Sequence, residues 1–212
     1  MMMMAAIALG VAGAAPTTAE FTVGGERFRV KIPAGFCLPG PDQEVAMAKI
    51  AASDPANVTD VAFIECGRRT DELPELLAIK TLRMFETTPL KRDTFVPQMA
   101  AALPALDTLE TQRKLLDQSE GNISGATGTK VDLSGSVRGR GRDDVCAYVG
   151  GTIDVSVADR KVTGLVGACA TVVGDRQFSV YRVSYKPLAD GGAGLLAEAR
   201  ATALAITPLP GK

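Results

Sequence analysis

Three arginines at alternating positions are the part of the sequence whose residue types and spacing most directly suggest chemistry. They are Arg138, Arg140 and Arg142, separated by single glycines and followed by Asp143 and Asp144. In an extended chain, side chains two positions apart project to the same side. Three guanidinium groups in a row can make paired hydrogen bonds to phosphate or carboxylate groups. The spacing therefore predicts a loop that binds an anionic partner such as lipid headgroups, a polyanionic glycan or an acidic protein patch. The alternative is a solvated hairpin connection that the two aspartates partly neutralise.

The residue types give little support to a catalytic function. The sequence contains no His, which excludes Ser-His-Asp and Cys-His hydrolysis and metal sites with histidine ligands. Carboxylates are plentiful, but no pair stands out as the acids of a glycoside hydrolase, and Trp is absent. Residues 125–130 lack the spacing of a phosphate-binding loop. We therefore assign no catalytic residue, no cofactor and no metal site, and we do not expect an enzyme.

Composition and charge favour a globular domain and argue against nucleic acid. The 212 residues include 23 basic and 24 acidic side chains, a net charge of −1, and 46 % are hydrophobic. A hydrophobic content of this size is ordinary for a chain that buries a core. No basic surplus is present, and no aromatic residue interleaves with the three arginines, so we expect no nucleic-acid partner.

An apolar run of small and aliphatic residues opens the sequence. It spans residues 1–15, carries no charge, and is shorter than the roughly twenty residues of a membrane-spanning helix. Small residues at its end, followed by the polar stretch from Pro16, are typical of a signal-peptidase site. We therefore expect a cleaved signal peptide over residues 1–15, a periplasmic or secreted location, and no transmembrane segment in the mature form. The alternative is an apolar tail on a cytosolic protein.

Four cysteines agree with export. They are Cys37, Cys66, Cys146 and Cys169, an even number with no Cys-x-x-Cys pair. In an exported chain this pattern favours disulfides over a metal site. Four cysteines allow three connectivities, and we favour Cys37 with Cys66 and Cys146 with Cys169 because each pair lies within one half of the chain.

The expected strand register makes the second pair awkward. A turn over residues 158–161 would place Cys146 opposite Val173, four residues beyond Cys169. We expect a bulge at Gly150 and Gly151 to absorb part of that offset.

The first half of the sequence predicts a hairpin followed by helices and a strand. Residues 21–32 alternate apolar and charged side chains after a Gly24-Gly25 turn, which is typical of a half-buried hairpin. The other expected elements are helices over 42–52, 73–85 and 93–103 and a strand over 58–66. Asp93 is the expected N-cap of the third helix, with Pro97 in its first turn. A strand over 77–85 is an alternative to the second helix, and residues 107–117 fit either a helix or a strand.

The second half predicts an antiparallel meander and a closing helix. Four β-like stretches, over 129–137, 145–157, 161–173 and 177–186, are joined by short connections. Residues 194–206 form an amphipathic helix pattern, with Leu195, Leu196, Ala199, Ala203 and Ile206 on one side. No long linker divides the chain. We therefore expect a single α+β domain over residues 20–208, in which helices flank an antiparallel sheet.

This order of elements resembles the Mog1/PsbP-like α+β superfamily. The resemblance rests on an N-terminal strand that ends in Ile-Pro-x-Gly-Phe over residues 32–36, the strand Phe-Ser-Val-Tyr-Arg-Val-Ser-Tyr-Lys over 178–186, and the closing amphipathic helix. Phe36 stands where such domains often carry Trp. Members of that superfamily mostly act as accessory or binding modules, so the resemblance implies binding and no catalytic residues.

These observations lead to two functional expectations. The first is an exported, soluble accessory or binding module of the cell envelope, whose partner is an envelope protein or an anionic envelope surface. The alternative is a small hydrolase or transferase that uses carboxylates alone outside the cytoplasm. A cleft lined by two acids with shifted pKa values would favour the enzyme. An exposed apolar patch or sheet edge would favour the binding module.

Overall fold

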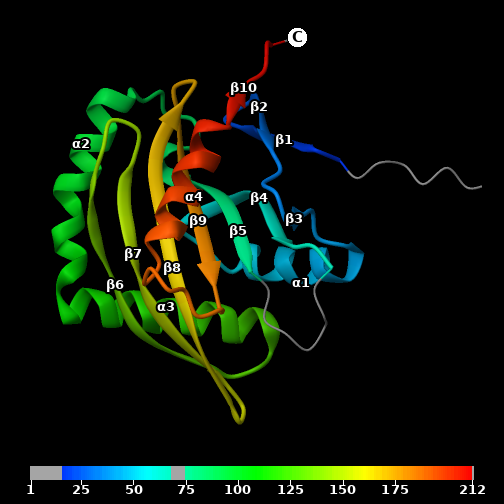
Figure 1. Ribbon diagram of the computed structural model, residues 1–212, viewed down its shortest axis with the longest axis vertical. Coiled ribbons are helices and arrows are strands. Elements are labelled where there is room, and N and C mark those ends of the chain that lie inside the picture. Colours follow the sequence, from blue (N-terminus) through cyan, green and yellow to red (C-terminus); the bar gives the residue numbers. More distant parts are fainter. Residues whose placement is uncertain (1–15, 68–74, 212) are drawn as a thin grey trace, which may run out of the picture.

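The computed structural model describes residues 16–67 and 75–211, and a seven-stranded antiparallel sheet forms the centre of this part of the chain (Figure 1). The strand order is β3-β4-β5-β9-β8-β7-β6. Its strands are β3 (Phe36–Cys37), β4 (Asn57–Glu65), β5 (Leu76–Leu82), β6 (Val131–Arg142), β7 (Ala147–Val157), β8 (Arg160–Val173) and β9 (Arg176–Ser184). The last four strands form the expected meander, so the prediction of an α+β fold on an antiparallel sheet is confirmed.

A smaller sheet packs against the large one. Its strands are β1 (Thr18–Val23), β2 (Glu26–Lys31) and β10 (Thr207–Pro208). The predicted turn is present, because Gly24 and Gly25 have φ angles of 56° and 84°, which residues with a Cβ atom rarely adopt. The rings of Phe21 and Phe28 lie 5.8 and 5.0 Å from the ring of Phe178. This aromatic cluster joins the hairpin to strand β9.

Helices lie on both sides of the large sheet (Figure 1). They are α1 (Pro41–Ala52), α2 (Arg92–Ala102), α3 (Leu109–Thr127) and α4 (Ala193–Leu204), with short 3-10 helices η1 (Arg83–Phe85) and η2 (Leu103–Asp107). Helix α4 packs on β8 and β9, α2 packs on β8 from the other side, and α3 runs beside β6. The expected closing helix is confirmed, with Leu195, Ala199 and Ala203 buried. No helix in the described part of the chain is long and apolar enough to cross a membrane.

Each face of the sheet carries its own hydrophobic core. On the α4 face, the core joins the small sheet, α4 and the central strands, and it includes Phe28, Phe63, Phe178, Cys146 and Cys169. On the α2 face, a smaller core consists of Phe95, Val96, Leu103, Ala147 and Val172. Inner strands are therefore apolar on both faces, which explains why their sequences lack a clean alternation.

Strand β5 shows this effect and corrects one prediction. The helix expected over 73–85 is wrong in its described part, because residues 76–82 form a strand between β4 and β9. The alternative strand over 77–85 is confirmed as far as residue 82, where η1 follows. Leu77, Ala78 and Ile79 are all buried, so both faces of the strand are apolar. A continuous apolar run of this length has the same appearance in a buried strand and in a helix. Residues 68–74 lie outside the described part of the chain, as does the signal peptide expected over residues 1–15.

The start of α2 corrects a second prediction. The N-cap is Lys91, not Asp93, which lies in the first turn, and Pro97 lies inside the helix. A carboxylate in the first turn still interacts favourably with the helix N-terminus without capping it. The open choice at 107–117 resolves as a helix, since most of this segment belongs to α3.

Both disulfides join the pairs favoured from the sequence, Cys37 with Cys66 and Cys146 with Cys169. The expected offset and bulge are wrong. Strand β7 turns into β8 through two residues, so Val157 pairs with Arg160, and the ladder between the two strands has no register shift at Gly150 and Gly151.

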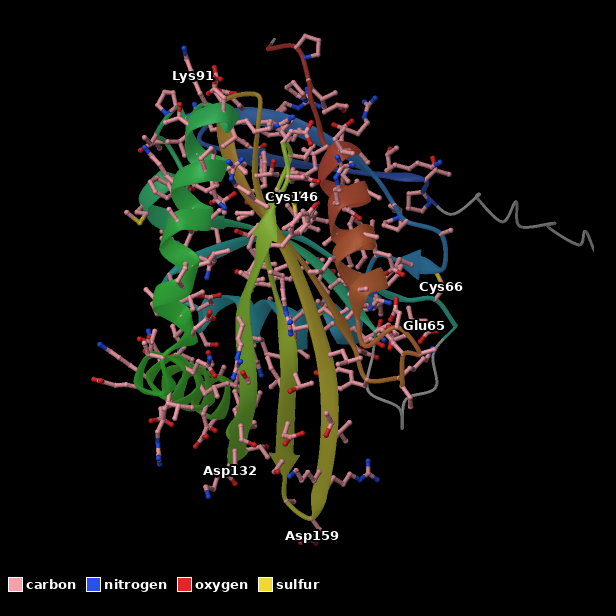
Figure 2. All side chains as sticks on the ribbon, turned by 60° about the vertical axis from the view of Figure 1, so that its left-hand side comes forward. Glu65, Cys66, Lys91, Asp132, Cys146 and Asp159 are labelled. Carbon is pink, nitrogen blue, oxygen red and sulfur yellow. A yellow bond between two sulfur atoms is a disulfide. The ribbon has the colours of Figure 1, made fainter. Side chains whose placement is uncertain are left out.

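The shorter turn explains the geometry of the second disulfide. Tyr148 pairs with Cys169, which leaves Cys146 only two residues from the direct partner of Cys169, with a Cα–Cα distance of 5.2 Å. The hairpin tip near Asp159 projects beyond the body of the protein (Figure 2). Charged residues are therefore tolerated at the start of β8, where the sequence suggested a turn.

Candidate anion-binding site on strand β6

The three arginines lie at the end of β6, the outermost strand of the large sheet. They belong to the strand itself and not to a loop, and all three are exposed. The expectation that they project to one side is wrong, because the pairing of β6 with β7 shifts by one residue between Gly139 and Arg142. Gly141 lies in this bulge with a φ of 83°, a conformation that suits glycine.

Cross-strand partners show which side of the sheet each arginine occupies. Arg138 pairs with Gly150, which pairs with Gly167, and a Cβ atom on Gly167 would lie 2.8 Å from Leu195 of α4. Directly paired residues share a face in an antiparallel sheet. Arg138 therefore projects to the α4 face.

Arg140 projects to the same face of the sheet as Arg138, but Arg142 projects to the opposite face. The Arg140 Cγ atom lies 3.4 Å from the position of a Cβ on Gly150, which places Arg140 on the α4 face as well. Arg142 pairs with Ala147, a member of the α2-face core. The bulge thus separates the row into a pair, Arg138 and Arg140, and a single arginine on the opposite face.

The pair leaves most of its hydrogen-bonding capacity unused. Arg138 donates from Nε to Ser136 Oγ at 3.1 Å, and Arg140 donates from Nε to the Gly150 carbonyl oxygen at 3.2 Å. Within the described part of the chain, neither terminal guanidinium nitrogen of these residues has a recorded partner. Each Nε contact fixes the start of the guanidinium group, so the terminal nitrogens are presented to solvent and to a ligand.

Arg142 lines a separate hollow of about 260 Å³ on the α2 face. Its walls are Arg92, Asp93, Val96, Pro97, Arg142, Asp143 and Asp144. Arg92 is partly committed, because its Nε donates to the Val172 carbonyl oxygen at 2.8 Å. Two arginines face three carboxylates in this hollow, so it has no excess of positive charge for an anion.

Asp143 lies in the connection after β6 and, among the described residues, forms its ion pair with Arg200 and not with any of the three arginines. One carboxylate oxygen accepts from the amides of Val145 and Cys146, at 2.8 and 2.7 Å. The other accepts from Arg200 Nε of α4 at 2.6 Å and from the Tyr148 hydroxyl at 2.8 Å. Burial alone would raise the pKa of Asp143, but these four hydrogen bonds outweigh it and hold the pKa well below its usual value. Asp143 is thus a structural clamp, and Arg200 is engaged by it.

A carboxyl with a raised pKa lies elsewhere, at a bulge in β4. The side chain of Asp60 has its Oδ2 atom 2.7 Å from Thr81 Oγ1, which also lies 3.2 Å from the Gln177 carbonyl oxygen. Burial, opposed by the Thr81 hydrogen bond and assisted by the charge of Glu86, raises the pKa of Asp60 to about 7. Asp60 and Glu86 line neither the hollow at Arg142 nor the groove beside α3. The carboxyl with the raised pKa is therefore not paired with a second acid in either of these two hollows, and the described residues hold no group of three or more metal-binding side chains.

A buried ion-pair cluster escaped the sequence analysis. Arg182 of β9 lies 2.6 Å from Glu75 and 2.6 Å from Glu198 of α4, and its guanidinium group lies 4.8 Å from the Phe36 ring. The side chains of Arg182 and Glu75 are 8 % and 6 % exposed. One signal was available, since Arg182 is the only charged residue in the apolar run 178–183 that predicts a buried strand.

Comparisons with known proteins bear on the fold. No protein-family model matches the chain, and no curated protein sequence matches it. Among solved structures, it is similar to the solution structure of cyanobacterial PsbP (CyanoP) from Synechocystis sp. PCC 6803, with 12 % identity and a TM-score of 0.40. The alignment covers 95 % of this chain and 99 % of that one. This similarity concerns the fold alone and says nothing of what the chain does.

Proposed function

We propose that this protein is an exported binding module of the cell envelope that contacts an anionic membrane surface through Arg138 and Arg140. One observation carries the proposal: two neighbouring guanidinium groups project from one face of an outermost strand, and their terminal nitrogens have no recorded partner in the described part of the chain. Guanidinium groups recognise phosphate oxygens through paired hydrogen bonds, and lipid headgroups present such oxygens in a plane.

Export is part of this proposal. Two disulfides persist in oxidising compartments and are rare in the cytosol, and the apolar run over residues 1–15 is typical of a secretory signal. Mass spectrometry of the protein from the envelope fraction tests it. We expect a mature N-terminus near Pro16 and both disulfides formed. Retention of residues 1–15 with reduced cysteines would contradict export.

Vesicle binding tests the anionic contact. We expect the protein to bind vesicles that contain an anionic phospholipid and to be released by salt, since surface charge pairs are screened by ions. An arginine near an anionic surface contributes about 1 kcal/mol, so the double variant R138S/R140S should bind about 30-fold more weakly. Equal binding of the variant and the wild type would refute the proposal, as would equal binding to zwitterionic vesicles.

A further inference from the structure

A groove of about 630 Å³ separates α3 from the outer edge of β6. Its volume falls in the range of ordinary ligand sites. The lining residues are Leu109, Gln112, Arg113, Leu116, Asp117 and Glu120 of α3, and Asp132, Leu133, Ser134 and Gly135 of β6. In Figure 2, Asp132 lies near the start of β6, at the end of the strand opposite the arginines.

Side chains from α3 and η2 cover part of the β6 edge. The amides of Val131 and Leu133 donate to Ser124 Oγ and Glu120 Oε2, at 2.9 and 3.0 Å. Beyond these, the amide of Gly139 lies 3.4 Å from Asp107 Oδ1. Capping of this kind protects an edge strand from pairing with other chains.

The protection is interrupted in the middle. Backbone groups point alternately to the two sides of a strand, so Gly135 and Val137 project their amide and carbonyl groups to the same outer edge. No side chain in the described part of the chain is recorded as a partner of either amide. Gly135 is exposed and lines the groove. The unpaired edge at Gly135 therefore opens into the groove, and the edge at Val137 lies two residues beyond the groove lining.

Gln112 supplies a second and independent sign of a ligand. Its side chain lines the groove, is only 7 % exposed, and has an Nε2 atom without a hydrogen-bond partner. A buried amide donor without an acceptor is costly, and such groups are rare in native proteins. A carbonyl oxygen placed in the groove would satisfy it.

The side chains of the groove indicate what the ligand carries. Leu109, Leu116 and Leu133 offer apolar contacts, and Leu109 is 82 % exposed. Two carboxylates of α3, on Asp117 and Glu120, lie beside a single arginine, Arg113. Asp132 also lines the groove, but its side chain has the strand parity of the α4 face and pairs with Lys130 at 2.9 Å. The excess of negative charge on α3 favours a positively charged ligand.

We propose that this groove binds an extended peptide segment of a partner protein, which pairs with β6 at Gly135 and Val137 and carries a basic residue next to an apolar one. Main-chain hydrogen bonds would give affinity, and alternate side chains would enter the groove or face solvent. This site is distinct from Arg138 and Arg140, which project to the α4 face, and the two proposals can fail separately.

Three pools of eight-residue peptides with blocked ends test the proposal against the disulfide-bonded protein, with backbone amide chemical shifts as the readout. All pools carry randomised apolar residues at alternate positions. The first has Lys at the central polar position, the second has Glu there, and the third has the Lys pattern interrupted by Pro. We expect the Lys pool to shift the Gly135 and Val137 amides and to bind at least 10-fold more tightly than the Glu pool, while the Pro pool leaves both amides unchanged.

Two variants sharpen the test. Q112L removes the unpaired donor without creating another, so the fold should be retained while the Lys pool binds about 10-fold more weakly. D117K should reverse the preference between Lys and Glu, whereas the matched variant D159K at the distant hairpin tip should not. Equal binding of all three pools, no shift at Gly135 and Val137, or the same shifts from raising the protein concentration alone would overturn the proposal.

Discussion

Arginines on the inner strand β9 and on the outer strand β6 have the same charged group in opposite surroundings. Arg182 is 7 % exposed and is held by Glu75 and Glu198, so its charge is balanced inside the fold. Arg138 and Arg140 are exposed, and within the described part of the chain each donates a side-chain hydrogen bond from Nε alone.

Burial accounts for the difference. A buried charge must be paired, or the fold loses the solvation of that charge. An exposed arginine is solvated by water and keeps its donors available for a partner. The outer strand, where burial imposes no pairing, is therefore where binding residues can be retained, and the inner strand is where arginine acts structurally.

Breaking the inner cluster should have the largest effect. R182M leaves the carboxylate of Glu75 buried without its partner, so we expect the free energy of unfolding to fall by about 3–5 kcal/mol. Urea unfolding followed by circular dichroism measures this change. The double variant R182M/E75Q removes the stranded charge and should recover part of the loss. Equal losses in the single and double variants would contradict a charge-pairing role.

The buried disulfide should contribute more to stability than the more exposed one, just as the buried arginine does. Their sequence separations, 29 and 23 residues, are similar, so the chain-entropy contribution of each is roughly 3.5 kcal/mol. Cys146 and Cys169 are also fully buried in the α4-face core, whereas Cys66 is exposed. We expect C146A/C169A to lower the melting temperature more than C37A/C66A does. The reverse order in calorimetry would show that the outer bridge is the more important one.

Asp60 should make stability depend on pH. Its pKa is raised from 3.8 to about 7 in the folded protein, so folding favours the protonated form. The stabilising effect of that proton is complete below pH 3.8 and is lost as pH rises to about 7, which should lower the free energy of unfolding by an amount on the order of 4 kcal/mol. D60N should flatten this dependence in urea titrations at successive pH values. An unchanged profile in D60N would assign the dependence to another group.

Replacing the outer arginines should have the smallest effect on stability. R138S/R140S removes two exposed side chains whose recorded contacts are single Nε hydrogen bonds, so the free energy of unfolding should change by less than about 0.5 kcal/mol. Thermal unfolding measures it. A loss above about 2 kcal/mol would mean that these arginines act structurally, as Arg182 does.

Most elements of the fold could be predicted from the sequence where one face of a strand or helix meets water. The β1–β2 hairpin and α4 show clear periods, and the Gly24-Gly25 pair specifies its turn. Strand β5 could be predicted only as an alternative to a helix, because burial on both faces removes the alternation of apolar and polar residues that distinguishes a strand. The turn between β7 and β8 was misplaced because exposed charged residues at the start of β8 look like a loop.

The candidate site could be predicted in residue type but not in direction. The spacing of Arg138, Arg140 and Arg142 correctly marks an extended segment, yet the bulge at Gly141 turns the third arginine away. A glycine between two charged residues fits a regular strand equally well, so no local signal locates the bulge. The groove beside α3 depends on packing between two elements and has no signature in either one.

The most direct test of the proposed function compares two double variants of equal charge on opposite faces of the sheet. R138S/R140S changes the α4 face, whereas R142S/R160S changes the α2 face. Arg160 is placed on the α2 face because it pairs with Val157, which in turn pairs with the buried Val131. Sedimentation with anionic vesicles at several salt concentrations measures both. The proposal predicts about 30-fold weaker binding for R138S/R140S and nearly wild-type binding for R142S/R160S. Equal weakening of the two variants would contradict it, because binding would then follow total charge and not the pair of arginines on β6.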